Sequence, residues 1–216
     1  MPSLPPGLRE GDHIGVALRP LGSSLPLGLA GLAAASIVLS GHELGWISQT
    51  QRTTVGVLVL CAGAALQAVS SVLAFAARDG AAGSTLGTLA SGWAATGIVF
   101  IVTAPGSTNG ALGTLQLALG GMVLLFSTSV AASKLVPSLA VALAAVRFLT
   151  SGLYQVSANT TWEHVSGVIG LAVFGIAAYA AWALELEDAR HRPVLPIGRR
   201  PTPNEPAREP GIRASL

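Results

Sequence analysis

Charged side chains are scarce in this sequence of 216 residues. Asp, Glu, Lys and Arg make up 10% of the chain, whereas an average soluble domain has about 25%. A water-soluble fold covers its surface with polar groups, and 12 basic and 10 acidic side chains are too few for that at this length. Hydrophobic residues account for 51% of the chain, and the mean hydropathy is +0.63. The composition therefore predicts an integral membrane protein.

Several motifs that carry chemistry are absent. Cys61 is the only cysteine, which excludes a disulfide framework within the chain. There is no glycine-rich phosphate loop followed by Lys and Ser or Thr, and no serine in a nucleophile-elbow context. The pairs His42-Glu43 and Glu163-His164 are adjacent in sequence and lack the spacing of metal ligands. We therefore expect no enzyme, no metal site and no cofactor.

Basic residues do not gather into a patch. Few ionisable side chains lie between residues 25 and 184, so the net charge of +2 describes the two ends of the chain. A nucleic-acid-binding protein places Lys and Arg on one face with aromatic residues between them. Because no such patch is present, the sequence predicts no nucleic-acid partner.

Six segments are long and apolar enough to cross the hydrocarbon core of a membrane, which needs about 20 residues. Turn-forming residues separate them, among them Asp79-Gly80 and the segment 105–110. The sequence therefore predicts an all-α membrane protein with six transmembrane helices. The link near Lys134 is so short that the fourth and fifth segments form either a tight hairpin or one helix bent at Pro137. The segments are Leu25–Glu43, Val55–Ala76, Ser84–Ala104, Ala111–Ala132, Leu135–Val156 and His164–Leu184.

Basic residues near the ends of the spans predict the orientation. With six spans both termini lie on the same side of the membrane, and that side carries ten of the Lys and Arg residues. The opposite side carries Arg52 alone. Residues 1–22 contain no apolar run long enough for a signal peptide. We therefore expect a multi-pass protein of the bacterial inner (plasma) membrane with cytoplasmic N and C termini.

Arg147 is the most informative polar residue because it lies inside the fifth span. An arginine at the centre of a span costs about 2.5–3.5 kcal/mol on insertion scales. A carboxylate, backbone carbonyls, water or a bound anion must compensate this cost. Two interpretations stay open: a structural arginine that snorkels or caps a neighbouring helix end, and an anion-attracting group beside a permeation path.

Other polar side chains within or beside the spans must also face the bundle interior or a water path. Tyr154 shares a helical stripe with Arg147, seven positions further on. Gln67 makes either an interhelical hydrogen bond or a contact with substrate. His42 and His164 lie at span ends, where a histidine hydrogen-bonds at the interface or relays protons. The candidate path residues are Ser24, His42, Gln67, Arg147, Tyr154 and His164.

Two short segments flank the predicted bundle in a way that composition does not explain. Residues 24–31, Ser-Leu-Pro-Leu-Gly-Leu-Ala-Gly, open the first span, and Ser24 is able to cap that helix. Residues 191–198, His-Arg-Pro-Val-Leu-Pro-Ile-Gly, follow the sixth span. The first segment resembles the Asn-Pro-Ala-Pro-Leu-Gly-Leu signature of the acetate uptake transporters, also called the succinate–acetate permease family. The second is similar to the tail that follows the sixth helix in that family. Residue types also agree at Gln67, Trp93, His164, Gly167, Gly170 and Tyr179.

The resemblance implies a membrane transporter or channel for acetate and other small carboxylates, with uptake coupled to protons (symport) or following the gradient of the acid. It implies six helices that form a funnel around a path in each protomer, and a homo-oligomeric ring in the lipid, usually a hexamer. The hydrophobic girdle of the family would fall on Leu32, Leu89 and Ala144, which predicts a wider and more aliphatic constriction here. Arg147 stands where the family usually has an apolar residue, so a larger or differently charged carboxylate is a plausible substrate.

The expected organisation has four parts: an N-terminal cytoplasmic tail (1–22), a six-helix transmembrane domain (23–186), a tail motif like that of the family (187–198) and a disordered cytoplasmic tail (199–216). Two other functions stay open. One is a channel for small neutral solutes such as urea or amides. The other is a membrane scaffold or accessory subunit that transports nothing and docks a cytoplasmic partner or anionic lipid through its tail.

Overall fold

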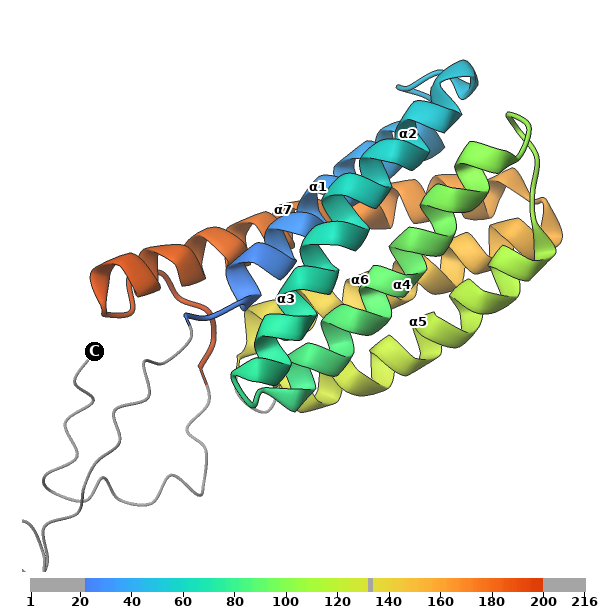
Figure 1. The fold of residues 1–216 in the computed structure, drawn as a ribbon. Helices are drawn as coiled ribbons and strands as arrows, with labels where there is room; N and C mark the ends of the chain where they lie inside the picture. The colour runs from blue at the N-terminus through green and yellow to red at the C-terminus, as the bar shows by residue number, and fades with distance from the viewer. Residues whose placement is uncertain (1–21, 132–133, 200–216) are drawn as a thin grey trace, which may run out of the picture.

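The protein folds into a bundle of long α-helices (Figure 1). The computed structural model describes residues 22–131 and 134–199. Within these ranges, six helical segments are long and apolar enough to cross a membrane, which confirms the expected six-span, all-α membrane fold. The elements are α1 (Leu25–Glu43), η1 (Gln49–Gln51), α2 (Arg52–Leu58), η2 (Val59–Ala64), α3 (Ala65–Ala76), α4 (Gly80–Val102), α5 (Gly110–Ala131), α6 (Leu135–Ser157) and α7 (Thr160–Arg190).

The elements from η1 to α3 form one span, Gln49–Ala76, with a change of helix type in its middle. Residues Val59–Ala64 (η2) form a π-helix, whose wider turn is often found at functional positions. This turn lies between α1 and α4: a Cβ at Gly63 would lie 2.7 Å from Cβ of Ala35 and 3.0 Å from Cγ of Trp93. The π-helix therefore lies beside the interior of the bundle, where it brings the second span close to its two neighbours.

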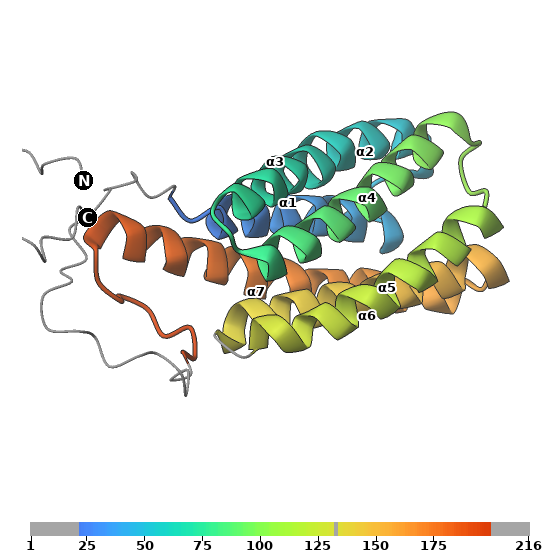
Figure 2. The ribbon, with the colours of Figure 1, turned by 60° about the horizontal axis from the view of Figure 1, so that its bottom comes forward.

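The six spans form a closed ring. Each span packs against the next along the chain, and α7 closes the ring by packing along both α6 and α1 (Figure 2). Helices α5 and α6 lie side by side as two separate helices. Of the two expected alternatives, the structure therefore has the tight hairpin and not one helix bent at Pro137. Pro137 lies in the first turn of α6, where no intrahelical hydrogen bond is lost. Close packing relies on glycine: a Cβ at Gly56 would lie 2.7 Å from the carbonyl oxygen of Gly97.

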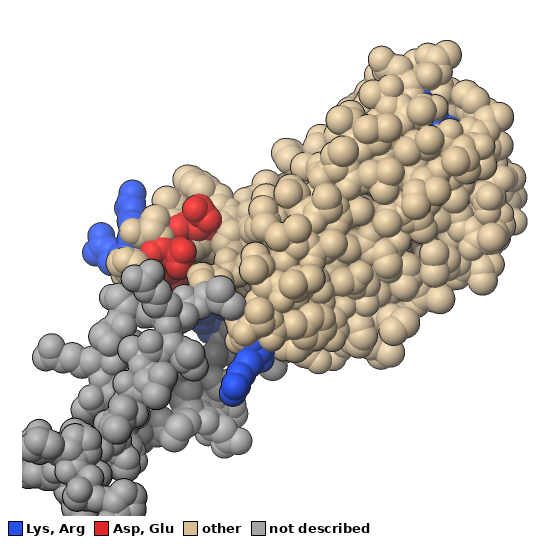
Figure 3. Space-filling view, viewed as in Figure 1, with Lys and Arg blue, Asp and Glu red and all other residues tan. Residues whose placement is uncertain are grey.

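Both ends of the described chain, residues 22 and 199, lie at the same end of the bundle, here called the terminal end (Figure 1). The links from α3 to α4 and from α5 to α6 lie there too. In the space-filling view, Lys, Arg, Asp and Glu gather at the terminal end, and the body of the bundle is almost free of charge (Figure 3). An uncharged body between a charged end and a nearly uncharged one is the pattern of a multi-pass membrane protein.

The α-helices begin and end within four residues of the expected windows, apart from the end of α7. Helix α7 runs to Arg190, beyond the predicted end at Leu184, so the expected division after residue 186 falls inside a helix.

Ser24 makes no side-chain hydrogen bond that caps α1. Its carbonyl oxygen accepts hydrogen bonds from the amide of Gly28, at 3.2 Å, and from the hydroxyl of Ser70. Ser24 therefore links α1 to the second span instead of capping its own helix. The expected tails, 1–22 and 199–216, lie outside the described residues except for residues 22 and 199.

The segment after α7 folds back onto the bundle and completes the start of α6. The amides of Leu135 and Val136 donate to the carbonyl oxygens of Gly198 and Ile197, both at 3.1 Å. The side chain of Ile197 is buried, and the Tyr179 hydroxyl donates to the carbonyl oxygen of Pro196 at 3.0 Å. The first amides of a helix lack partners within it. The tail motif therefore supplies the acceptors that the N-terminus of α6 needs.

We expect Ile197→Ala to loosen this segment, because burial of the isoleucine side chain holds the tail against α6. Loss of a buried isoleucine side chain costs about 2–5 kcal/mol, so the tail should open at least on the order of tenfold more often. Trypsin cleavage after Arg190 in detergent-solubilised protein measures this opening. The control is Val194→Ala, which alters a half-buried residue of the same segment. Equal cleavage rates for both variants would contradict the proposed anchoring role.

Candidate functional site

A buried ion pair joins α6 to α1 in the interior of the bundle. Nη2 of Arg147 lies 2.7 Å from Oε2 of Glu43, and both side chains are almost fully buried, with 2% and 6% exposure. Nη1 of Arg147 donates to the carbonyl oxygen of Ser36 at 3.0 Å and to Oγ of Ser40 at 2.9 Å. A carboxylate, backbone carbonyls, water or a bound anion was expected to offset the cost of burying Arg147. The structure supplies the first two, from Glu43 and Ser36.

Two serines complete the environment of the Glu43 carboxylate. The hydroxyls of Ser151 on α6 and Ser166 on α7 each lie 3.1 Å from Oε1 of Glu43. They also lie 3.1 Å from each other. Each hydroxyl has one proton to donate, so both serines can donate to the carboxylate at once. We call Arg147, Glu43, Ser40, Ser151 and Ser166 the polar cluster; it connects α1, α6 and α7.

Small and aromatic residues shape the space around Arg147. A Cβ built at Gly170 on α7 would overlap Nη1 of Arg147 and Oγ of Ser40, so only glycine fits there. On the side of α4, Cζ of Arg147 lies 5.8 Å from the ring centroid of Trp93, within the range of a cation–π contact. The Trp93 ring packs in turn on Phe148, with centroids 5.2 Å apart. The guanidinium is thus enclosed from three helices.

The three expected girdle residues lie one helical turn from the Arg147 level. Leu32, Leu89 and Ala144 are fully buried, with 0% exposure, and belong to one hydrophobic core. They precede Ser36, Trp93 and Arg147, respectively, by three or four residues. The helices that carry them, α1, α4 and α6, all run away from the terminal end (Figure 1). An apolar layer therefore lies on the terminal side of the polar cluster.

Gln67 and Ser24 lie on the other side of this apolar layer. Nε2 of Gln67 donates to the carbonyl oxygen of Gly28 at 3.3 Å, one turn before Leu32 on α1. Oε1 of Gln67 has no hydrogen-bond partner among the described residues. The interhelical hydrogen bond expected for Gln67 is therefore present, and one of its polar atoms remains unpaired in the interior.

The remaining candidates lie toward the end opposite the termini and do not join the polar cluster. His42 is buried, and its ring packs against Phe100 with centroids 5.6 Å apart. Tyr154 is half-buried. His164 is exposed, and its Nδ1 lies 2.8 Å from the carbonyl oxygen of Thr160 in its own helix. The sequence pattern therefore grouped residues that lie at different depths of the bundle.

Sequence reasoning did not select the partners of Arg147. In the sequence, Glu43 stands out only as the last residue of the first span. One signal points to it: an arginine inside a span requires a counter-charge, and Glu43 and Glu163 are the two carboxylates next to the predicted spans on that side. Ser151 lies four positions after Arg147 on the same helical face, whereas Ser166 has no distinguishing signal in the sequence.

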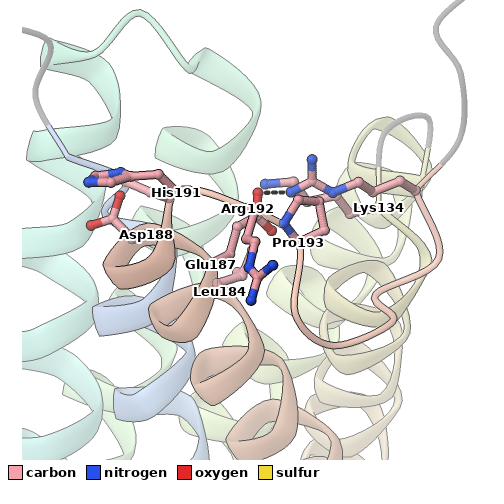
Figure 4. A pocket seen from close by; sticks show the side chains of 9 residues that line it. Lys134, Leu184, Glu187, Asp188, His191, Arg192 and Pro193 are labelled. Atoms are coloured by element: carbon pink, nitrogen blue, oxygen red, sulfur yellow. Dashed lines mark hydrogen bonds and ion pairs between the residues drawn. The ribbon is translucent and has the colours of Figure 1, made fainter. Parts of the chain in front are cut away.

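A pocket of about 420 Å³ lies at the terminal end, where the tail returns to the bundle (Figure 4). Its lining mixes charges of both signs, and Arg199 pairs with Glu187 across it. Burial and the neighbouring Arg199 lower the pKa of Lys134, which faces the pocket. The pocket therefore has no single charge that would select one class of ligand. Among the described residues, no group of three or more His, Cys, Asp or Glu side chains is placed to hold a metal ion.

The fold and the buried site define a six-span membrane protein with an apolar layer next to a polar cluster. Its fold is shared with a solved channel, described as the bacterial acetate channel SatP. The TM-score is 0.73 at 22% sequence identity, and the match covers 82% of this chain and 99% of that one. No protein-family model matches the sequence, and no curated protein matches it significantly. The expected resemblance to acetate transporters is thus supported by the fold.

We expect Gly170→Ala to destabilise the protein by about 1–3 kcal/mol, because the added methyl group forces the Arg147 guanidinium away from its partners. The control is Gly175→Ala on the same helix, where a Cβ meets open space. Thermal unfolding in detergent should give a midpoint about 2–4 °C lower per kcal/mol for the first variant only. Equal midpoints would mean that Arg147 is not held against α7.

Proposed function

We propose that this protein transports acetate or another small carboxylate across the bacterial inner membrane, as a proton-coupled transporter or as a channel. The observation that carries the proposal is the shared fold with the acetate channel SatP, at a TM-score of 0.73 over 99% of that chain. The sequence signatures at residues 24–31 and 191–198 support it independently. In this proposal both termini are cytoplasmic, because ten basic residues lie on their side of the spans.

The physics of permeation follows from the layer formed by Leu32, Leu89 and Ala144. A carboxylate that enters an apolar constriction loses its water, and the cost is far lower for the protonated, neutral acid than for the anion. The aliphatic side chains therefore favour passage of the neutral acid or of an anion paired with a proton. In this proposal the path runs from Ser24 and Gln67 through the apolar layer to the polar cluster. His42, Tyr154 and His164 lie beyond the cluster, toward the outer mouth.

Many apolar side chains face outward on the spans, as lipid or a neighbouring protomer requires; examples are Val72 (68% exposed), Leu125 (70%) and Trp182 (59%). The proposed assembly is a homo-oligomeric ring, a hexamer by resemblance. An apolar, uncharged constriction also suits a small neutral solute such as urea. A scaffold without transport is the third possibility, and the following assay separates the three.

We expect reconstituted vesicles to take up labelled acetate or succinate, and uptake to grow with an inward proton gradient. The reason is that the gradient supplies the proton that neutralises the acid before the apolar layer. Labelled urea is the control solute, and vesicles without protein are the blank. Urea flux that ignores pH would favour the neutral-solute channel. Absence of any flux would favour the scaffold.

The girdle assignment predicts opposite effects of small and large substitutions. Leu32→Ala and Leu89→Ala should raise passive carboxylate flux several-fold because they widen the constriction, and Leu89→Trp should reduce it to background. Leu125→Trp is the matched control, since Leu125 is 70% exposed on the outer surface. Unchanged flux in all three girdle variants would show that the path does not pass between these residues.

A further inference from the structure

The polar cluster has the composition of a carboxylate-binding site, and a carboxylate of the chain itself occupies it. The guanidinium of Arg147 holds one oxygen of Glu43 at 2.7 Å, and the hydroxyls of Ser151 and Ser166 hold the other at 3.1 Å. Arginine and hydroxyl donors are the groups that recognise carboxylates in proteins. A small carboxylate from solution would find the same donors if Glu43 withdrew.

We propose that a substrate carboxylate exchanges with Glu43 on Arg147 when Glu43 takes up a proton, so that each carboxylate bound is linked to one proton. This inference rests on the proposed function and deepens it, because it assigns both the binding site and the proton acceptor. In the resting state Glu43 accepts the hydrogen bond from Nη2 of Arg147. In the exchanged state the substrate accepts it, and the protonated Glu43 carboxyl becomes a hydrogen-bond donor.

Charge balance favours this exchange over binding of the anion alone. The resting cluster contains one guanidinium and one carboxylate, both buried, and is neutral. Addition of an anion without a proton would leave two carboxylates beside one arginine, and departure of Glu43 without a substrate would leave a buried cation unpaired; both are costly. Only the coupled exchange keeps the site neutral throughout.

Three buried polar groups at or near Arg147 have no hydrogen-bond acceptor in the described structure. Nε of Arg147, Oγ of Ser36 and Nε1 of Trp93 are buried and make no hydrogen bond within the described part of the chain. Both neighbours touch the guanidinium: the Ser36 carbonyl oxygen accepts from Nη1 of Arg147, and the Trp93 ring lies 5.8 Å from Cζ. A bound carboxylate accepts more hydrogen bonds than Glu43 receives here. A ligand that sits between the cluster and the apolar layer would satisfy donors that Glu43 leaves unpaired.

The ionisable groups near Glu43 set the environment of this proton. Arg147 faces it from α6, and Tyr154 lies further along the same helix. Glu163 faces it from α7. His42 precedes it on α1, and Arg52 of the second span donates to the carbonyl oxygens of Ala104 and Ser107 near the same end. Among these, Arg147 alone makes an ion pair with Glu43 in the described structure.

The first test is acetate binding to the detergent-solubilised protein between pH 7 and 8, where acetic acid is itself ionised. Titration calorimetry in buffers of different ionisation enthalpy counts the protons taken up with acetate, which carries a single carboxylate. We expect one proton per carboxylate, and an affinity that falls about tenfold for each unit of rising pH. Binding without proton uptake by the wild-type protein would overturn the exchange, and this result needs no variant.

Glu43→Gln mimics the protonated carboxyl, so its carboxylate binding should become independent of pH and take up no proton. The matched control is Glu163→Gln, which removes a nearby carboxylate that makes no ion pair with Arg147 in the described structure and should retain the wild-type slope. A pH dependence that persists in Glu43→Gln would assign the proton to another group and overturn the inference.

A second test does not depend on transport. Glu43→Ala leaves Arg147 without its counter-charge, and acetate from solution should then restore stability. We expect the unfolding midpoint of this variant to rise with millimolar acetate and to be unchanged by equal urea or chloride. The double variant Glu43→Ala with Arg147→Gln should lose the response. No rise with acetate would overturn the binding site, whereas flux in wild-type vesicles would still support the proposed function. If acetate stabilised Glu43→Ala while wild-type vesicles showed no carboxylate flux, the binding site would be supported and the proposed transport function would be contradicted.

Discussion

The rest of the bundle depends on one buried charge and its neutralisation. Arg147 is compensated by a carboxylate from another span, and loss of either partner from such a pair costs about 3–5 kcal/mol. This constraint explains why serines surround Glu43 and why α7 has a glycine at residue 170, where a side chain would displace the guanidinium. It also fixes which helices are neighbours, because α1, α6 and α7 must meet at one point for the charge to be buried at all.

The global fold was predictable because the bilayer imposes a length and a hydropathy on each span. All six predicted windows correspond to helices, and the tight α5–α6 hairpin is one of the two alternatives that the short link at Lys134 predicted. Helix ends were less predictable. Ser24 has the residue type of a cap, yet its carbonyl oxygen accepts from Ser70, and this tertiary contact took precedence over local capping.

The site was predictable only in part. The position of Arg147 followed from the sequence because a charge inside a span is rare. Its partner did not, since Glu43 lies 104 residues away and contact depends on how the ring of helices closes. The π-helix at Val59–Ala64 had no local signal either, because its sequence, Val-Leu-Cys-Ala-Gly-Ala, has the same kind of small and apolar residues as the other spans. Hydropathy predicts where each transmembrane helix lies in the sequence. It does not predict which helices become neighbours in the ring.

The return of residues 197 and 198 to α6 has a consequence for biogenesis. The first amides of α6 find their acceptors in a segment that is synthesised more than sixty residues later, after α7. While the ribosome is still translating α7, the N-terminus of α6 must therefore rely on water or lipid headgroups at the membrane surface. Residues 197 and 198 thus close the bundle only after α7 has been synthesised, so insertion of the spans and completion of the fold are separate events.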